Sequence, residues 1–470
     1  MVHTFICLGV PMAVDVNSGA VHVLDNAAYD VLSLLDAPMA DICPKEFYQK
    51  LPQYDPAMLD EAWGELLELQ KNGLLFTNDS YIDPAAATLM QQDAPIKALC
   101  LHVSHDCNLR CQYCFASTGD FGTGRRMTMD VETAKKAIDF VIERSGSRRN
   151  IEVDFFGGEP LMAMDTVKAT VEYARSLEQK HNKNFRFTIT TNGVLLDDEN
   201  IEYINREMSN AVLSLDGRSE VNDRMRRTVS GGGSYDVILP KFQKLVQGRG
   251  EKDYYLRGTF TRYNPDFAAD VLHIADQGFR HVSVEPVVGS LDCDYSFREE
   301  DLPGILEEYE RLALELLKRE DVNFFHFNVD LSQGPCVIKR MRGCGAGCEY
   351  VAVTPDGDIY PCHQFVGNEK YRLGNVYDDA FNMELSRKFA ELNIYTRPDC
   401  KDCWARFYCS GGCSASNLLV NGDITRSNEV ACAMERKRLE CAIALNAIAA
   451  GMSERQNTDC NNTECNLCNH

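Results

Sequence analysis

The chain has 470 residues, with 48 Lys and Arg against 70 Asp and Glu, and a formal net charge of −22 at pH 7. This length allows about three domains, and 44% hydrophobic residues provide the cores of an ordinary soluble protein. The strong negative charge argues against a nucleic-acid partner, which requires clustered Lys and Arg, and against an anionic membrane surface.

Twenty cysteines are unevenly distributed along this chain. No basic segment followed by an apolar stretch opens the sequence, and no apolar run approaches the ~20 residues that span a bilayer, so we expect a cytoplasmic protein. In a reducing compartment, dense cysteines indicate metal ligation or catalysis rather than disulfides. None falls between Cys114 and Cys293, whereas eight lie between Cys336 and Cys413, and such clusters indicate sites.

Residues 1–80 predict a small module of strands and helices with a winged-helix-like order. Apolar runs at 5–10, 12–16 and 20–24 predict three strands, helical patterns follow at 26–35 and 56–72, and 74–76 predicts a last strand. With Lys45, Lys50 and Lys71 as its only basic side chains, the module lacks the basic face of a DNA reader. We expect an exposed strand edge that binds a peptide as one more strand; a simple cap over the catalytic domain is the alternative. Residues 81–95, rich in Ala, Asp and Pro, predict a linker.

Residues 96–320 alternate apolar runs with helical patterns. Strands are expected at 98–104, 151–156, 185–191, 211–215, 254–261 and 281–288, and helices at 131–144, 166–179, 199–207, 235–247, 267–277 and 302–318. This α/β alternation predicts a parallel sheet with right-handed crossovers. Six units form a partial (β/α)6 TIM-like barrel, in which the chemistry lies at the C-terminal ends of the strands.

The first of these strands runs directly into three cysteines, Cys107, Cys111 and Cys114, spaced C-x3-C-x2-C. Thiolates are the usual ligands of iron–sulfur clusters, and soft sulfur selects such clusters, zinc or Cu(I). Three thiolates can hold three irons of a [4Fe–4S] cube and leave the fourth to bind a small molecule by its amine and carboxylate. A partial zinc knuckle is the alternative. Later strands also end in small or polar residues, at 157–160, 190–193, 214–217 and 285–287.

The triplet, followed one βα unit later by Gly-Gly-Glu-Pro, resembles the radical SAM superfamily. The resemblance implies that Cys107, Cys111 and Cys114 ligate a cluster that binds S-adenosylmethionine (SAM) and, once reduced, cleaves it to a 5′-deoxyadenosyl radical. It also implies a set of SAM contacts. Gly157, Gly158 and Glu159 would receive the amine of the methionine part, Ser214 and Arg226 would contact SAM, and Tyr113 and Val287 would line the adenosyl part.

Residues 335–450 carry a second cysteine pattern. Cys344, Gly357 and Cys362 are followed by Cys400-x2-Cys403-x5-Cys409-x3-Cys413 and then by Cys432. This pattern resembles the SPASM extension of radical SAM peptide-modifying enzymes, which implies two auxiliary [4Fe–4S] clusters and three clusters in all. The first would use Cys344, Cys362 and Cys413, and the second Cys400, Cys403, Cys409 and Cys432. Structural zinc sites are the alternative.

Three questions about this region stay open in the sequence. The first auxiliary cluster lacks a fourth ligand, which could be Cys348 or Cys336, or the place could stay open for a substrate thiolate. His363, next to Cys362, could transfer a proton near neutral pH or only support the cluster.

Residues 451–470, with Cys460, Cys465 and Cys468, predict a disordered tail, with metal binding as the alternative. The turn at 355–358 predicts a hairpin.

More narrowly, residues 15–22, 344–347 and 360–367 resemble the SCIFF (six-cysteine peptide) maturases. That family implies a radical SAM enzyme that installs thioether crosslinks, from Cys sulfur to carbon, in a ribosomally made cysteine-rich precursor peptide bound through its leader. It also implies an electron donor such as flavodoxin or ferredoxin. The alternatives are another radical SAM/SPASM oxidation, such as formylglycine formation on a sulfatase or peptide decarboxylation, and a non-enzymatic adaptor.

Overall fold

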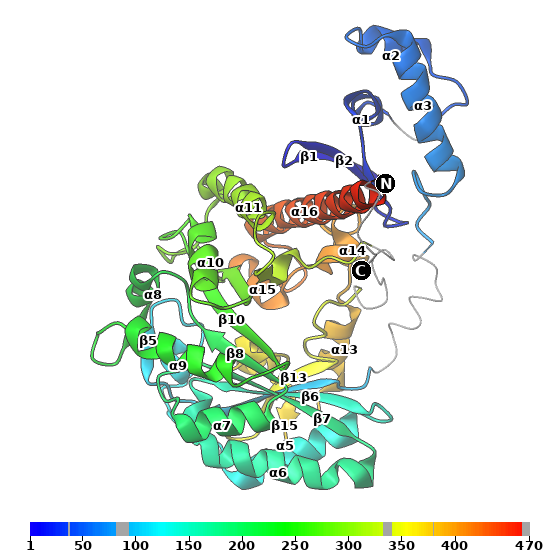
Figure 1. Ribbon diagram of the computed structural model, residues 1–470. Coiled ribbons are helices and arrows are strands. Elements are labelled where there is room, and N and C mark those ends of the chain that lie inside the picture. The colour runs from blue at the N-terminus through cyan, green and yellow to red at the C-terminus, as the bar shows by residue number, and fades with distance from the viewer. Residues whose placement is uncertain (36–37, 81–93, 332–340, 379, 463–470) are drawn as a thin grey trace, which may run out of the picture.

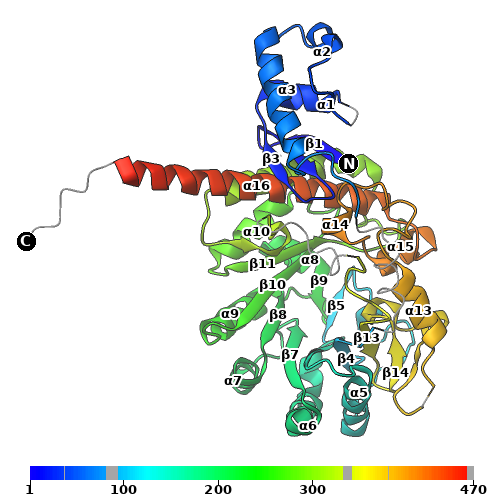
Figure 2. The same ribbon diagram turned by 90° about the vertical axis from the view of Figure 1, so that its right-hand side faces the viewer.

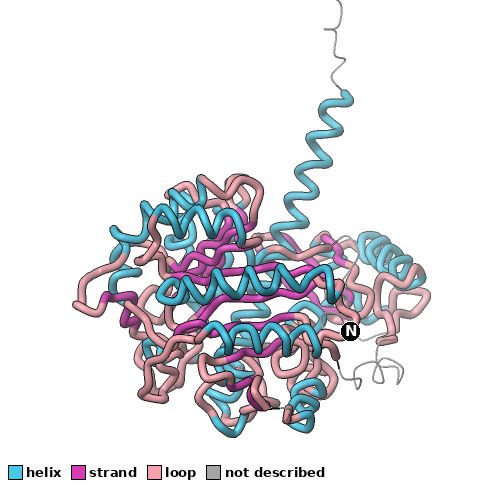
Figure 3. The backbone as a smooth tube through the Cα atoms, turned by 90° about the horizontal axis from the view of Figure 1, so that it is seen from below, coloured by secondary structure: helices cyan, strands magenta, loops and turns pink. Residues whose placement is uncertain are grey.

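The computed structural model describes residues 1–35, 38–80, 94–331, 341–378 and 380–462. A curved sheet with helices on its outer side forms the body of the molecule (Figures 1 and 3). The small N-terminal module lies at one end of this body, beside a long C-terminal helix (Figure 2). None of the helices in the described ranges has the length and apolarity needed to cross a bilayer.

The body is built on the six strands that the sequence predicts. They are β4 (Ala98–Ser104), β6 (Asn150–Gly157), β7 (Asn184–Thr191), β8 (Asn210–Ser214), β10 (Asp253–Phe260) and β11 (His281–Pro286). Neighbouring strands pair in parallel in this order. The helices between and after them are α5 (Val131–Arg144), α6 (Met164–His181), α7 (Asp198–Glu207), α8 (Ser219–Met225), α9 (Tyr235–Gln247), α10 (Phe267–Asp276) and α11 (Leu302–Leu316). The predicted partial barrel is confirmed.

The two faces of the barrel sheet differ in polarity. Along β10, Leu256 and Phe260 are fully buried, whereas the side chain of Arg257 keeps 43% of its exposure and donates to Glu285 on β11 at 2.8 Å. A parallel sheet covered on both sides has nearly continuous apolar strands. Because these strands alternate, their apolar side chains pack under the helices and their polar ones line an open barrel interior.

The cysteine-rich domain continues the barrel sheet. Strand β13 (Tyr350–Val353) pairs in parallel with β4 and forms the predicted hairpin with β14 (Asp358–Tyr360), which pairs with β15 (Gly374–Asn375). Gly357 closes the hairpin turn with φ +86°. At the other edge, β12 (Asn323–Phe324) pairs with β11, and a separate ribbon joins β5 (Leu109–Cys111) to β9 (Arg226–Thr228). The sequence did not predict β5, β9, β12 or the β4–β13 pairing.

The N-terminal module contains β1 (Val2–Cys7), β2 (Val10–Asp15) and β3 (Val21–Val23) as an antiparallel sheet in that order, with α1 (Asn26–Ser33), α2 (Lys45–Lys50) and α3 (Pro56–Lys71). Asp25 and Asp55 cap α1 and α3 as acceptors for backbone N–H groups. The predicted last strand at 74–76 is wrong. The chain turns there instead, with Gly73 at φ +69° and Phe76 at φ +53°, and Leu74 N–H bonds back to Leu69 in the helix.

The cysteine-rich domain contains the helices α13 (Met383–Glu391), α14 (Arg406–Cys409), α15 (Ser414–Asn421) and α16 (Glu429–Asn462), and the module contacts this domain at α14, at α16 and just before α14. The His3 ring stacks on Trp404 with centroids 4.1 Å apart, and the buried sulfurs of Cys7 and Cys441 lie 3.7 Å apart. Arg406 donates to Asn17 at 2.7 Å and pairs with Asp79 at 2.9 Å. The module is therefore fixed to the segment that follows Cys403.

The C-terminal tail differs from its predicted structure, and most of the predicted linker falls outside the described residues. Helix α16 continues to Asn462, so residues 451–462 are helical where the sequence predicted a disordered tail. An existing helix extends by one hydrogen bond per residue, and no proline interrupts this one. Most of the predicted linker, 81–93, and residues 463–470 with Cys465 and Cys468 lie outside the described residues.

Candidate active site

A cavity of about 140 Å³ lies at the C-terminal ends of β4, β6, β7 and β8. Among its lining residues are the triplet Cys107, Cys111 and Cys114 and the predicted SAM contacts Tyr113, Gly157, Gly158, Glu159, Ser214 and Arg226. The structure thus brings together residues from four strand ends, as the barrel rule predicts. Val287 is not among the lining residues; β11 ends at Pro286, and Val287 N–H donates to Phe260 O at 2.9 Å.

The glycine pair at the end of β6 holds the start of the cluster loop by its backbone. Gly158 N–H donates to Ser104 O at 2.7 Å, and Glu159 N–H donates to Asp106 O at 2.9 Å. A Cβ on Gly158 would lie 2.1 Å from Asp106 O, and one on Gly157 would lie 2.2 Å from Ser104 O. Only glycine permits this approach, so the Gly-Gly pair positions the loop that carries Cys107.

The carboxylate of Glu159 joins β6 to the next strand end. It is 1% exposed and accepts hydrogen bonds from Thr191 Oγ1 at 2.7 Å and from the backbone N–H groups of Asn192 at 2.8 Å and Leu161 at 3.0 Å. Burial raises its pKa to about 7, and these three donors oppose that shift. Because the carboxylate already accepts three hydrogen bonds in this structure, it holds the ends of β6 and β7 together. Its contact with the SAM amine stays a prediction.

The fourth strand end supplies a buried carboxylate that the sequence analysis did not select. Asp216 is fully buried and accepts a hydrogen bond from Tyr113 Oη at 2.6 Å, while Arg226 donates to the same hydroxyl at 2.8 Å and lies 3.7 Å from Asp216. Burial raises the pKa of Asp216, and the Arg226 guanidinium opposes that shift. Asp216 thus ties the cluster loop to β9. In the sequence, the only indication of its role was its position in the polar strand-end segment 214–217.

Arg226 gives this cavity a buried cation with an unpaired donor. Its side chain lines the cavity, the residue is 8% exposed, and its Nε is buried without a hydrogen-bond partner. An unpaired buried donor on a cation is costly unless a ligand accepts from it. The free Nε therefore suits a carboxylate such as that of SAM. Burial also raises the pKa of Cys107 to about 11 and of Cys111 to about 12, so these thiols ionise when bound iron compensates the charge.

His363 lies between this cavity and the cysteine-rich domain. Its ring centroid is 5.2 Å from that of Phe115 and 5.0 Å from that of Phe156, and both phenylalanines line the cavity. Tyr350 Oη lies 3.3 Å from His363 Nδ1. Burial lowers the pKa of His363 to about 4, with Arg257 adding to the shift. The neutral ring therefore packs behind two lining residues of the cavity, directly beside Cys362.

Members of each predicted auxiliary set influence one another electrostatically. Burial raises the pKa of Cys362 to about 12, and the nearby Cys413 and Cys344 add to this shift. In the second set, burial raises the pKa of Cys432 to about 11, with contributions from Cys400 and Cys403, and Cys409 is affected in turn by Cys432. In the described ranges, no three His, Cys, Asp or Glu side chains form a single-ion site.

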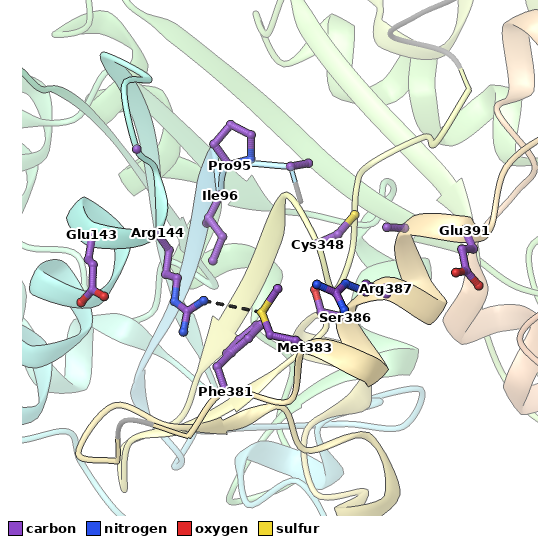
Figure 4. A pocket seen from close by; sticks show the side chains of 13 residues that line it. Pro95, Ile96, Glu143, Arg144, Cys348, Phe381, Met383, Ser386, Arg387 and Glu391 are labelled. Atoms are coloured by element: carbon purple, nitrogen blue, oxygen red, sulfur yellow. Dashed lines mark hydrogen bonds between the residues drawn. The ribbon is translucent and has the colours of Figure 1, made fainter. Parts of the chain in front are cut away.

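Cys348 lines a different cavity of about 500 Å³ between α5 and α13, together with Ile96, Arg144 and Ser386 (Figure 4). Cys344, Cys362 and Cys413 do not line this cavity, but Cys344 adds to the burial that raises the pKa of Cys348 to about 11. The Cys348 thiol lies 3.4 Å from Gly345 O, its hydrogen-bond acceptor. Cys336, the other candidate for the fourth ligand, lies outside the described residues, as do Cys465 and Cys468.

Comparisons with known protein families agree with this geometry. Residues 101–248 match the radical SAM superfamily, and residues 344–404 match the SPASM iron–sulfur cluster-binding domain. The first range contains the triplet and Gly-Gly-Glu-Pro, and the second contains Cys344, Cys362, Cys400 and Cys403. The chain therefore carries a radical SAM domain followed by a SPASM domain, and the predicted cofactors, [4Fe–4S] clusters and SAM, are confirmed.

Two curated relatives carry different activities in their names. The chain is 23% identical over 329 residues to a cysteine-type anaerobic sulfatase-maturating enzyme of Clostridium novyi, a match that covers 66% of this chain and 85% of that enzyme. It is 21% identical over 452 residues to the radical SAM cyclopropyl synthase TigE of Paramaledivibacter caminithermalis, with 88% of each chain covered.

Two solved structures share the fold. The sulfatase-maturating enzyme anSMEcpe, with bound AdoMet and the Kp18Cys peptide, matches with a TM-score of 0.63 and 20% identity over 76% of this chain and 100% of that one. Streptococcus suis SuiB bound to its precursor peptide SuiA matches with a TM-score of 0.50 and 15% identity over 92% of this chain and 98% of SuiB. The SuiB match leaves fewer residues unmatched than the N-terminal module contains, so it includes part of that module.

Proposed function

We propose that this protein is a radical SAM enzyme that installs thioether crosslinks in a ribosomally made, cysteine-rich precursor peptide. One observation carries the proposal: Cys362 is influenced by both Cys413 and Cys344, whereas Cys348 lines a separate cavity and, of these three cysteines, is influenced by Cys344 alone. With these three thiolates as its only protein ligands, a cube would keep one iron open. That iron can bind the thiolate of a substrate cysteine and hold its sulfur for bond formation.

The arrangement of the residues suits such a reaction. The bound cofactors supply the radical chemistry, since a reduced cluster cleaves SAM to a 5′-deoxyadenosyl radical. The cavity beside Arg226 would hold SAM, and Phe115, Phe156 and His363 separate it from Cys362. A peptide in the polar barrel interior can therefore lie between the two sites. Thioether formation would break one C–H bond and one S–H bond and form one C–S bond. The deoxyadenosyl radical would take the hydrogen atom from carbon, the sulfur would lose its proton, and the remaining electron would pass to an auxiliary cluster.

Mass spectrometry of a candidate peptide tests the reaction. The probe is a short cysteine-rich peptide encoded beside this gene, incubated anaerobically with SAM and the enzyme, with flavodoxin or ferredoxin as the proposed electron donor. We expect a product that has lost two hydrogens per crosslink and kept all its sulfur. Absence of 5′-deoxyadenosine from reduced, cluster-loaded protein would instead indicate a non-enzymatic adaptor.

A second candidate function is formylglycine formation on a sulfatase, which the similarity to the Clostridium novyi enzyme favours. Peptide decarboxylation belongs to the same class of radical SAM/SPASM oxidation. Product mass separates the three reactions, because formylglycine formation at cysteine removes the sulfur and decarboxylation removes CO2. A sulfatase peptide converted faster than the cysteine-rich peptide would favour the second candidate.

We further propose that the precursor binds through its leader at the edge of β3. Among the described residues no strand pairs with the outer side of β3, and Val23 is 61% exposed. Because Leu24 N–H bonds inward to Pro11 O, the alternate N–H of Val23 points outward. An extended peptide can accept from it as an added strand, and the SuiB structure, which contains its precursor peptide, covers part of the same module.

A proline at this edge tests the leader site. Val23→Pro removes the outward donor without removing a β2–β3 hydrogen bond, so leader binding measured by fluorescence anisotropy should be lost, whereas Val23→Ala should bind as the parent does. Uncoupled SAM cleavage should persist in both variants and in a chain that lacks residues 1–80, while that shortened chain should no longer modify the peptide. Unchanged leader affinity in Val23→Pro contradicts the proposal.

A further inference from the structure

Arg397 is a buried cation between the two auxiliary cysteine sets. The residue is 3% exposed. Its carbonyl accepts from the N–H of Cys400, in the second set, at 3.1 Å. Its guanidinium donates to Ser414 Oγ at 2.8 Å, and Ser414 directly follows Cys413 of the first set. A further bond to Ile424 O at 2.6 Å fixes the other end of the guanidinium.

The side chain lies close to cysteines of both sets. A Cβ added to Gly411 would lie 3.1 Å from Arg397 Nε and 4.0 Å from Cys400 Sγ, so the guanidinium and this sulfur lie on the same side of Gly411. Gly411 has a φ of +89° and no side chain, and the guanidinium lies close to its backbone. Burial lowers the pKa of Arg397, and four nearby cysteines, Cys400, Cys413, Cys409 and Cys344, oppose that shift. Two of these belong to each set.

In the part of the chain that the structure describes, Arg397 forms no salt bridge with Asp or Glu, and the carboxylate on which its charge acts is Asp423, whose pKa it helps to lower. A buried cation without an anion is strongly unfavourable, and buried charges are normally paired or associated with metal centres. Carbonyl and hydroxyl acceptors satisfy its hydrogens but carry no net charge. Besides Asp423, the anions available to Arg397 are the thiolate-ligated clusters that these cysteines would hold.

We propose that Arg397 raises the reduction potentials of both auxiliary clusters at once. A reduced cluster carries one more negative charge than its oxidised form, so a fixed cation beside it favours reduction, and net charge and hydrogen bonds are among the factors that set cluster potentials. A single guanidinium between the two sets therefore shifts both reduction potentials in the same direction. The proposal requires only the two clusters and is independent of which peptide product forms.

Potentiometric titration of the auxiliary clusters tests the proposal. The full chain carries Cys107→Ala, Cys111→Ala and Cys114→Ala, so that only the auxiliary clusters are reconstituted and followed by EPR. In this background Arg397→Gln should lower both midpoint potentials with iron content unchanged, and Arg397→Lys should restore them towards the parent values. Arg436→Gln, which removes a cation beside Cys432, should lower only the second potential.

Ser414→Ala keeps the charge but removes its anchor beside Cys413, so it should lower the first potential alone. This variant decides the question if Arg397→Gln fails to hold iron. Unchanged potentials in iron-loaded Arg397→Gln, or a shift confined to one cluster, would overturn the proposal. If Arg397→Gln loses its iron, an unchanged first potential in Ser414→Ala would overturn the proposal.

Discussion

Replacing Asp216 with Asn isolates the electrostatic support of the SAM cavity. The substitution keeps the shape of a fully buried side chain and removes its charge. Asp216 accepts from Tyr113 Oη at 2.6 Å and from Thr259 N–H at 3.1 Å, and it lies 3.7 Å from Arg226. Hydrogen bonds to a charged group contribute about 1.5–3 kcal/mol each. Asn retains one acceptor, so we expect a loss of about 2 kcal/mol.

This loss should appear as weaker SAM binding, because Arg226 and Tyr113 both line the cavity. A loss of about 2 kcal/mol corresponds to a roughly 30-fold higher Kd. Anaerobic equilibrium dialysis with labelled SAM measures this Kd, and iron analysis verifies that the cluster is present. An iron-loaded Asp216→Asn protein whose Kd stays within threefold of the parent value would refute the reasoning.

Asp270→Asn is the matched control. Asp270 is also fully buried and accepts from Arg218 Nε at 2.8 Å, but it does not line the cavity. Breaking this pair should lower thermal stability while leaving the SAM affinity within threefold of the parent. If both variants weaken SAM binding equally, general destabilisation rather than the position of Arg226 explains the effect.

Three other outcomes follow from the structure. Gly158→Ala should abolish iron binding at the triplet and SAM cleavage, because its Cβ would lie 2.1 Å from a cluster-loop carbonyl, and a colorimetric iron assay measures the loss. Gly64→Ala, on the exposed side of α3 with open space around its Cβ, should instead raise stability by about 1 kcal/mol in thermal melts. Cys348→Ala should retain the iron of all three clusters and Cys362→Ala should lose that of one, so equal iron loss would make Cys348 a ligand. Chelation of iron should increase hydrogen exchange in residues 396–413, which contain only the short helix α14, more than in the barrel strands.

Local patterns allowed the barrel to be predicted from the sequence. Strands β6, β7, β8 and β10 alternate buried and interior side chains, β4 is a short apolar run, and helices such as α5 and α6 have their own apolar stripe, so these elements are encoded within about 20 residues. Helix α5, Val131–Arg144, has the predicted bounds because Asp130 caps its start. The cluster cysteines were found because their spacing is itself the chemical requirement.

The missed features depend on contacts between distant segments. Asp216 matters because Tyr113 and Arg226 reach it from other parts of the chain, and Arg397 matters because two cysteine sets fold around it. Neither side chain has a local pattern that separates it from an ordinary buried polar residue. The false strand at 74–76 had apolar composition, but the left-handed turn at Gly73 follows from helix termination.

The pairing of β13 with β4 has a consequence for synthesis of the chain. Strand β4 is apolar, and its partner on one side, β13, begins about 250 residues later. At typical elongation rates of 5–20 residues per second, that edge waits roughly 10–50 s for its partner on the ribosome. An unpaired apolar edge invites association with other nascent chains. The cysteine-rich domain ends this vulnerable interval when its hairpin pairs with β4.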